Sequence, residues 1–387
     1  MSRIQFVLES IIETARKEDY SSFDISNLLQ TRYYALSSKL SAGLAKKVIQ
    51  KPYKSIIKHY PDFIRKISSS DKQKFPQSHA FVIRGYLQLL KKEKKFINIE
   101  EVFELGSWLI ENRSNYSKHF AWGQPFTWYS RMIFPKNIPR ATVSSQVAWA
   151  FLDLFEFTGD DQYLDIVVDV CYLFKNDFNY TEDVNGNICL SYTTVDKYHI
   201  HNASMLAAAI ILRVARITKN RELDKFGRRL VNFTIGHQNK DGSFYYWAPP
   251  DKLNYMIDNY HTGFVLESLK TIVEDTKSED YLKSYQLGME FYRRELFDGI
   301  VPKLSTKKLY PIDIQSCAQS ILTFTESNLS DSYRKTAIEI ADFSISSLYI
   351  DNKKHFGYRM NNTNSLDESY YFRWGDAWMI RALAQLV

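Results

Sequence analysis

The chain has 387 residues, of which 45% are hydrophobic and 24% are charged, a composition that is typical of globular proteins and excludes the disordered and fibrous classes. A net charge of +6 is small for this length, so charge alone predicts neither a nucleic-acid groove nor a membrane-binding surface. The three cysteines are far apart, which argues against a disulfide framework or a zinc ribbon and favours reduced thiols.

The first 75 residues hold an amphipathic segment and then a basic stretch between Lys46 and Lys74. They lack the uninterrupted apolar core of a secretion signal, and the longest apolar run of the chain, 205–212, is too short to cross a bilayer. We therefore expect a cytoplasmic protein that is not an integral membrane protein. Residues 1–75 are expected to supply either an outer helix that closes a ring or an added N-terminal helical extension, and the sequence leaves both open.

Further along the chain, three segments share one pattern, in which an apolar helix runs into a threonine, a polar turn and a second helix. The threonines are Thr158, Thr218 and Thr276, which gives a period of roughly sixty residues, and a looser copy follows after Ser320. The first helix of each copy is apolar nearly all round, whereas the second is amphipathic. This contrast predicts inner helices that are enclosed by outer ones.

Six inner helices are expected, at about 78–91, 143–157, 202–217, 260–275, 314–326 and 373–386. No Gly/Ser-rich or Pro-rich linker divides the chain. The sequence therefore predicts an all-α fold, an (α/α)6 toroid or six-hairpin barrel, formed by residues 1–387 as a single domain. Strand-like alternation is sparse, although 188–195 and 242–247 could form short hairpin pieces in long connections.

In such a toroid the inner helices begin at one end, where the preceding loops line a central funnel. Polar residues cluster at these starts, namely His201, Asn202, Asp258, Asn259, His261, Asp313, Gln315, Arg373 and Asp376. The incoming loops add Trp122, Gln124, Trp128, Arg131, Tyr198, Trp247 and Trp374. Rings stack on the C–H faces of sugars while polar groups bind their hydroxyls, so the pattern predicts a saccharide site. Helix capping and loop packing would explain some of these residues equally well.

Three strings resemble a known group of bacterial proteins: HNASMLAAAIILRVA from His201, YMIDNYHTGFVLESL from Tyr255 and FRWGDAWMIRALA from Phe372. Over roughly residues 75–387 the chain is similar to α/α-toroid proteins encoded with exopolysaccharide and capsule genes, the polysaccharide-biosynthesis proteins of the VpsJ type. The resemblance implies the six-hairpin glycosidase-like superfamily, which includes glycoside hydrolases, sugar 2-epimerases, polysaccharide lyases and uronate epimerases. It also implies an oligosaccharide or polysaccharide substrate and other polysaccharide-synthesis enzymes as partners, although one fold hosts many reactions.

Two reaction types fit these residues. Hydrolysis needs two carboxyl groups that flank the glycosidic oxygen, and our first hypothesis assigns them to Asp258 and Asp376, with Asp313 in reserve. Epimerisation or β-elimination instead needs a base beside an acidic C–H bond, and this second hypothesis uses a His or Tyr side chain. The candidates are His201, His261, Tyr198 and Tyr260 as the base, with Arg131 or Arg373 as the cationic clamp.

A third hypothesis is a non-catalytic glycan-binding or scaffolding toroid, with the basic stretch 46–74 as its docking face. The sequence has neither a Walker loop nor a G-x-G-x-x-G string, so no nucleotide cofactor is expected. The histidines lack the spacing of a metal site, and we expect no metal and no nucleic-acid partner.

Overall fold

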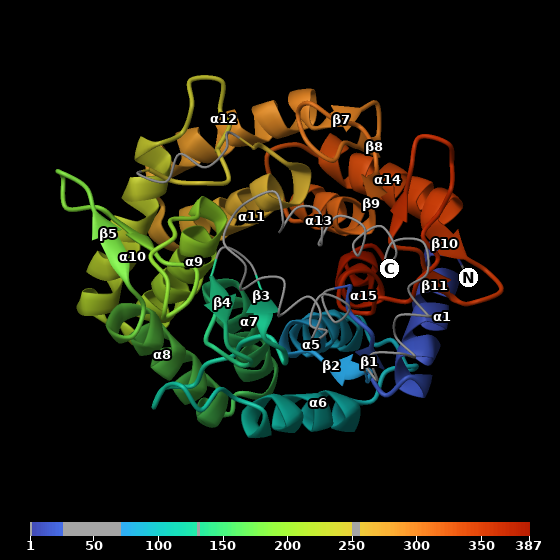
Figure 1. The fold of residues 1–387 in the computed structure, drawn as a ribbon, viewed down its shortest axis with the longest axis horizontal. Coiled ribbons are helices and arrows are strands. Elements are labelled where there is room, and N and C mark those ends of the chain that lie inside the picture. Colours follow the sequence, from blue (N-terminus) through green and yellow to red (C-terminus); the bar gives the residue numbers. More distant parts are fainter. Residues whose placement is uncertain (1, 26–70, 130–131, 250–255) are drawn as a thin grey trace, which may run out of the picture.

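The computed structural model describes residues 2–25, 71–129, 132–249 and 256–387, and these ranges form two concentric rings of helices (Figure 1). The inner helices are α5 (Pro76–Lys91), α7 (Ala141–Thr158), α9 (His201–Thr218), α11 (Asn259–Thr276), α13 (Ile314–Thr325) and α15 (Asp376–Ala384). The outer helices are α6 (Ile99–Glu111), α8 (Asp161–Asn176), α10 (Arg221–Gly236), α12 (Glu279–Glu295), α14 (Ser332–Leu348) and α1 (Arg3–Lys17). Each inner helix packs against the next, and α15 packs against α5. The predicted (α/α)6 toroid is confirmed.

The seam of the ring joins the two ends of the chain. Helix α1 packs against α15 and α14, so it occupies the outer position that the sixth hairpin requires (Figure 1). Residues 21–22 then pair with residues 73–74 as β1 (Ser21–Ser22) and β2 (Gln73–Lys74). Of the basic stretch, residues 46–70 lie outside the described residues, whereas Lys72 and Lys74 form ion pairs with Glu18 and Asp19.

The repeated threonine motif is a helix ending. The hydroxyls of Thr158, Thr218 and Thr276 donate to the carbonyl oxygens four residues earlier, at 2.7 to 2.8 Å. The next residues, Gly159, Lys219 and Lys277, have φ of 73°, 55° and 55°, a left-handed conformation that ends a helix. Side chains of Asp160, Asn220 and Ser278 then cap the following outer helix. One short motif thus stops the inner helix, turns the chain and starts the outer helix.

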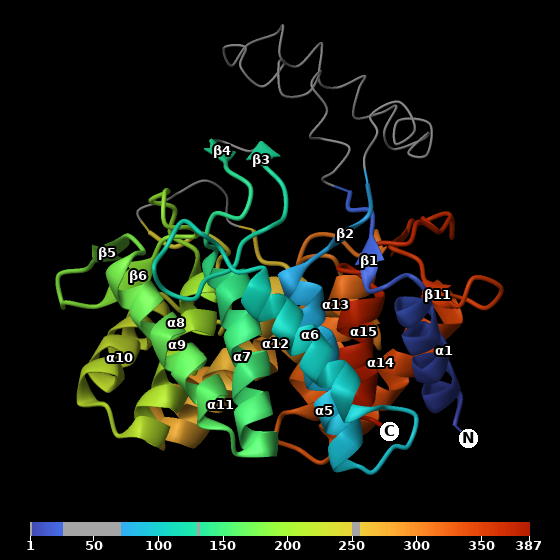
Figure 2. The same ribbon diagram turned by 90° about the horizontal axis from the view of Figure 1, so that it is seen from below.

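Long connections and short antiparallel ribbons gather at the end of the barrel where the inner helices begin (Figure 2). Besides β1 and β2, the ribbons pair β3 (Trp128–Tyr129) with β4 (Ile133–Phe134), β5 (Tyr180–Glu182) with β6 (Ile188–Leu190), β7 (Phe297–Asp298) with β8 (Val301–Pro302), β9 (Ile312–Asp313) with β12 (Arg359–Met360), and β10 (Tyr349–Ile350) with β11 (His355–Phe356). The strand expected within 188–195 is therefore present as β6. Residues 242–247 form no strand, and Trp247 makes an isolated bridge with Ile200.

A network of buried ion pairs ties the inner helices together. Arg84 of α5 binds Asp153 of α7 at 2.9 Å and lies 3.8 Å from Glu267 of α11. Glu267 also binds Arg381 of α15, whose guanidinium lies 3.4 Å from Glu326 at the end of α13. Next to this cluster, across Trp149, Arg213 of α9 binds Asp275 of α11 at 2.7 Å and lies 3.5 Å from Glu156 of α7. All six inner helices are linked in this way.

None of the helices in the described parts of the chain is both long enough and apolar enough to cross a membrane.

Candidate functional site

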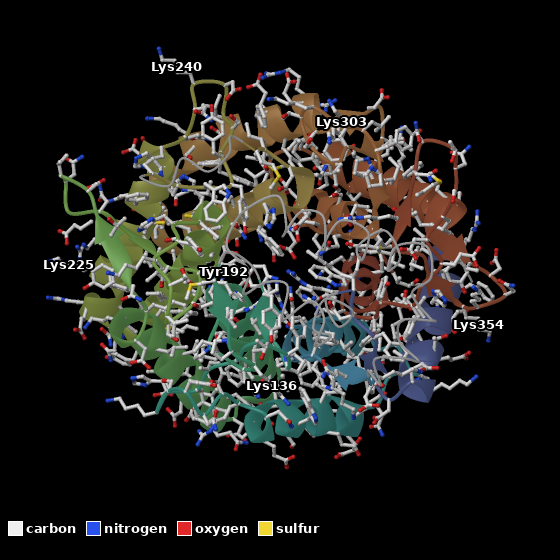
Figure 3. The ribbon with its side chains drawn as sticks, viewed as in Figure 1. Lys136, Tyr192, Lys225, Lys240, Lys303 and Lys354 are labelled. Atoms are coloured by element: carbon white, nitrogen blue, oxygen red, sulfur yellow. The ribbon has the colours of Figure 1, made fainter. Side chains whose placement is uncertain are left out.

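A cavity of about 220 Å³ lies in the barrel at the end where the inner helices begin. Its walls are Gln77, Gln124, Phe126, Trp128, Arg140, Thr142, Tyr192, Asn202, Tyr260, His261, Phe264, Gln315, Arg373, Trp374 and Trp378. Figure 3 places Tyr192 toward the middle of the ring, whereas Lys225, Lys240 and Lys354 lie at its rim. Aromatic rings and polar side chains thus alternate around one concave surface, and no carboxylate belongs to the described lining.

All six inner helices contribute to this cavity in a regular way. In five of them the second residue lines the cavity: Gln77, Thr142, Asn202, Tyr260 and Gln315. The sixth helix, α15, contributes Trp378, its third residue. Because the helices start at the same level around the ring, equivalent positions converge on one axis.

The lining carries polar atoms that have no hydrogen-bond partner among the described residues. They are Gln124 Oε1, Arg140 Nε, Asn202 Oδ1, Gln315 Nε2, Trp374 Nε1 and Trp378 Nε1. A buried donor or acceptor without a partner costs about 1 to 3 kcal/mol, so proteins rarely keep several such atoms together without a function. Donors and acceptors are mixed, which suits a ligand with hydroxyl groups because each hydroxyl both donates and accepts.

Arg373 is fixed in the cavity wall by residues from both ends of the chain. Its Nε and Nη2 donate to Oδ2 of the fully buried Asp24, at 2.8 and 2.5 Å. The guanidinium carbon lies 3.6 Å from the ring centroid of Trp374 and 5.1 Å from that of Phe75. The charge of Arg373 is therefore balanced by Asp24, and its orientation is set by two rings.

Arg140 is the second arginine of the wall and immediately precedes α7. Its side chain is held among aromatic rings, with the guanidinium carbon 4.7 Å from the Trp128 centroid and 5.8 Å from that of Tyr192. Burial lowers the pKa of this arginine, although Tyr192 favours its charged form. Among the described residues, no carboxylate lies within ion-pair distance of its guanidinium.

His261 and Asp258 form a dyad at the start of α11. The Asp258 carboxylate caps the helix by accepting from the His261 backbone N–H at 2.9 Å, and its other oxygen lies 2.7 Å from His261 Nδ1. Because an ionised carboxylate can only accept, Nδ1 carries a proton, and in the neutral imidazole the lone pair is then on Nε2. The imidazole is packed between the rings of Tyr246 and Tyr260, with centroids 4.4 and 4.0 Å away. Such a histidine is oriented to accept a proton through Nε2.

The two tyrosines beside His261 are kept neutral. Burial raises the pKa of Tyr260 and of Tyr246 well above the usual value, and the negative charge of Asp258 acts in the same direction. Both hydroxyls therefore keep their protons and can donate hydrogen bonds. Tyr260 lines the main cavity, whereas Tyr246 lines a small crevice beside it together with Asp258.

Eight of the expected residues line the cavity: Gln124, Trp128, Asn202, Tyr260, His261, Gln315, Arg373 and Trp374. Three others face the packed layers. His201 Nδ1 lies 3.2 Å from Thr234 Oγ1 of α10, and burial lowers the pKa of His201 to about 3. Asn259 donates to the Leu296 carbonyl oxygen at 3.0 Å, and the Trp122 indole donates to the Leu109 carbonyl oxygen at 2.7 Å. Successive helical residues point about 100° apart, so His201 faces outward where Asn202 faces the cavity.

Two of the three expected carboxylates, Asp376 and Asp313, do not reach the cavity surface. Asp313 is fully buried, caps α13 and accepts from Arg359 Nε at 2.6 Å. Asp376 accepts from the Phe356 backbone N–H at 2.9 Å, and burial raises its pKa to about 8. A pair formed by Asp258 and Asp376 across a bound sugar therefore has no support in the described lining.

The remaining expected residues lie in the loops. Tyr198 and Trp247 pack edge to face with centroids 5.7 Å apart, outside the cavity lining. Arg131, the alternative clamp, lies outside the described residues.

Sequence reasoning missed three residues that shape the site: Arg140, Tyr192 and Asp24. Arg140 carried a usable signal because it directly precedes an inner helix, as Asp258 and Asp313 do. Asp24 carried none, because its contact with Arg373 joins positions 349 residues apart.

A larger hollow, about 870 Å³, lies outside the ring between α1 and the segment around β11. Its charged side chains are largely paired with one another, as in Lys353 with Glu368 at 2.7 Å and Lys354 with Glu13 at 3.2 Å. Among its described lining residues, only the Tyr370 hydroxyl is buried without a hydrogen-bond partner, whereas the inner cavity has six such atoms. The inner cavity is therefore the candidate site.

No protein-family model matches the sequence, and no curated protein matches it significantly. Solved structures do share its fold. A GH76 alpha-mannanase from Bacteroides thetaiotaomicron has a TM-score of 0.61 at 15% identity, over 80% of this chain and 86% of that one. A cellobiose 2-epimerase from Bacillus thermoamylovorans has a TM-score of 0.62 at 9% identity, over 81% and 88%. A polysaccharide lyase has a TM-score of 0.55 at 12% identity, over 86% and 95%. The chain thus shares its toroidal fold with these proteins.

Proposed function

We propose that this chain is a carbohydrate-active enzyme that moves a proton at a carbon atom of its sugar substrate, with His261 as the acid–base and Asp258 as the residue that positions it. The observation that carries the proposal is the Asp258–His261 dyad. His261 lines the cavity, whereas no carboxylate belongs to the described cavity lining. Proteins named as a mannanase, an epimerase and a lyase share the fold, and carbohydrate chemistry is common to their names.

The walls of the cavity support a sugar as the ligand. Trp128, Trp374 and Trp378 give the cavity an aromatic wall that can contact C–H groups, and the unpartnered amide atoms of Gln124 and Gln315 suit hydroxyl groups. At about 220 Å³ the cavity is smaller than the roughly 300 to 1,000 Å³ of pockets for drug-sized ligands, so it suits a single sugar ring.

In this reaction, His261 Nε2 takes the proton of a C–H bond next to a carbonyl or carboxylate group, and Asp258 stabilises the imidazolium that forms. The electron pair of the broken bond is delocalised onto the neighbouring carbonyl oxygen. Return of a proton to the opposite face of the carbon inverts its configuration, whereas departure of a substituent from the next carbon gives an unsaturated sugar. Tyr260, whose hydroxyl keeps its proton beside His261, can donate a hydrogen bond to that carbonyl oxygen. The proton that returns to the carbon, or that leaves with the departing group, comes from water.

Hydrolysis is the competing proposal and requires two carboxyl groups on either side of the scissile bond. Asp258 is the one candidate that borders the site, and its two oxygens already hold the backbone and the ring of His261. The role in exopolysaccharide or capsule synthesis, the VpsJ-type relationship and the partner enzymes belong to the same proposal and rest on the sequence resemblance. The cytoplasmic location is also part of the proposal and rests on the pattern of the three cysteines.

Solvent exchange tests the reaction. The protein is incubated in D₂O with neutral reducing sugars, uronates and their oligosaccharides, and proton NMR follows the loss of individual C–H signals. We expect deuterium at one carbon, with a new epimer or an unsaturated product. Asp258→Asn should lower the rate by about 10² to 10⁴, the usual contribution of a positioned acid–base, and His261→Gln should lower it at least as much.

Asp160→Asn is the matched control, because Asp160 also caps a helix by accepting from a backbone N–H but lies on the outer ring. It should leave the rate unchanged. Release of new reducing ends that persists in His261→Gln would replace this proposal with hydrolysis. The absence of any reaction across the panel would favour the non-catalytic glycan-binding role.

A further inference from the structure

The two arginines of the cavity are not equivalent in charge. Arg373 shares its charge with Asp24 through two short hydrogen bonds. Arg140 is 6% exposed, and its Nε has no hydrogen-bond partner among the described residues. Among the described residues, Arg140 therefore lacks the ion pair that Arg373 has, although Tyr192 and the more distant Asp24 favour its charged form.

A buried guanidinium without an anion is costly, because its lost hydration is not replaced by a carboxylate. The local structure nevertheless builds this arrangement with care. The Arg140 backbone N–H donates to the Trp122 carbonyl oxygen at 3.0 Å, and residue 140 is bridged to Thr193. Three rings, those of Trp128, Tyr192 and Phe134, surround the guanidinium with centroids 4.7 to 6.0 Å away. The side chain is thus held in place before any ligand binds.

We propose that Arg140 is the receptor for a carboxylate group of the substrate, so that the site selects uronic-acid residues over neutral sugars. This inference rests on the proposed function and names its substrate class. A uronate supplies the single negative charge that Arg140 lacks, and it supplies the hydroxyls and C–H faces that suit the amides and indoles around it. Its carboxylate also acidifies the neighbouring C–H bond, the kind of bond that His261 would attack.

The tyrosine beside Arg140 contributes to the same selection. Tyr192 lines the cavity and stabilises the positive charge of Arg140. Its ring lies 6.2 Å from that of Trp128, so the two rings and the guanidinium form one continuous surface. A neutral CH₂OH group in place of the carboxylate would leave the guanidinium buried and unpaired, and such a sugar should bind more weakly.

Equilibrium binding tests this inference without relying on turnover. Isothermal titration calorimetry compares glucuronate with glucose, and galacturonate with galactose, as pairs that differ at one carbon. The wild-type protein should bind a uronate at least 10-fold more tightly than its neutral counterpart. Arg140→Met should lower uronate affinity by about 30-fold or more, as expected when one partner of a buried charge pair is removed, and should leave neutral-sugar affinity nearly unchanged.

Two further variants keep the test decisive. Arg140→Lys keeps the charge but loses the planar guanidinium, so its uronate affinity should lie between those of the wild type and Arg140→Met. This variant replaces Arg140→Met if Arg140→Met fails to fold. Arg294→Met removes an arginine from the exposed face of α12 and should leave every affinity unchanged.

The outcomes separate this inference from the proposed function. His261→Gln should bind uronates as the wild type does while losing deuterium exchange, which would support both. Deuterium exchange into neutral sugars without any preference for uronates would overturn the role of Arg140 and leave the acid–base role of His261 standing. Equal uronate binding by wild type and Arg140→Met would show that Arg140 is not the receptor. Tighter binding of a sugar sulfate monoester than of the uronate would show that the preferred anionic group is not a carboxylate.

Discussion

Replacing Asp376 by asparagine should change how the stability of this protein depends on pH. The Asp376 carboxyl is 1% exposed, and burial raises its pKa from 3.8 to about 8. Between these values the folded protein holds a proton that the unfolded chain releases, so the stability that this group supports is full below about pH 4 and is lost as the pH rises toward 8. Each pH unit in that interval lowers the free energy of unfolding by about 1.4 kcal/mol, which gives a total loss on the order of 5 kcal/mol.

The measurement is urea unfolding of the wild type and Asp376→Asn at several pH values across this interval. Asparagine keeps an acceptor for the Phe356 backbone N–H but cannot ionise. The stability difference between variant and wild type should therefore move in favour of the variant as the pH rises, by several kcal/mol in total. Other titrating groups are common to both proteins and cancel in the difference. Parallel pH profiles would refute the reasoning and mean that Asp376 ionises in the folded protein at its ordinary pKa.

Two further predictions concern stability. Glu267→Gln should lower the unfolding free energy by about 3 to 5 kcal/mol, because it removes the negative charge that compensates Arg84 and Arg381. Glu274→Gln is the control, because it loses only a more exposed pair with Lys270. It should change the unfolding free energy by no more than about 0.5 kcal/mol in the same urea titration. His201 has a pKa lowered to about 3 by burial, so its neutral form stabilises the fold only above the unfolded value of 6.5, and stability is lost as the pH falls below it. His201→Gln should therefore flatten the acid side of the thermal-unfolding profile, and an unchanged acid slope would contradict this.

The fold could be predicted because its signals are local. The Thr158, Thr218 and Thr276 motifs mark helix ends through bonds that span only a few residues, and the predicted starts of the six inner helices lie within three residues of the observed ones. Counting inner helices was then enough to identify a closed ring. Residues 26–70 lie outside the described part of the chain, so the expectation of an added N-terminal extension stays a prediction.

For the candidate site, the sequence indicated an end of the barrel better than individual residues. The predicted helix starts point to the end where the candidate cavity lies, but neighbouring residues such as His201 and Asn202 differ in direction by a rotation that composition does not reveal. Histidines and carboxylates are recognisable in a sequence as candidate catalytic groups. Arg140 is notable for its lack of an ion-pair partner among the described residues, which a sequence does not reveal. Asp258 was expected as a catalytic acid, and its contact with His261 gives it instead the geometry of a positioning residue.

The bond between Asp24 and Arg373 also has a consequence for synthesis of the protein on the ribosome. Hairpins such as α9 and α10 contain mostly local contacts and can form soon after they emerge, because short loops close at little entropic cost. Asp24 is synthesised 349 residues before its partner. The segment that carries Asp24 must therefore wait until five of the inner helices have been made, and only then can the arginine in the cavity wall be anchored. A truncated nascent chain would thus hold most of its helices before it could bind substrate.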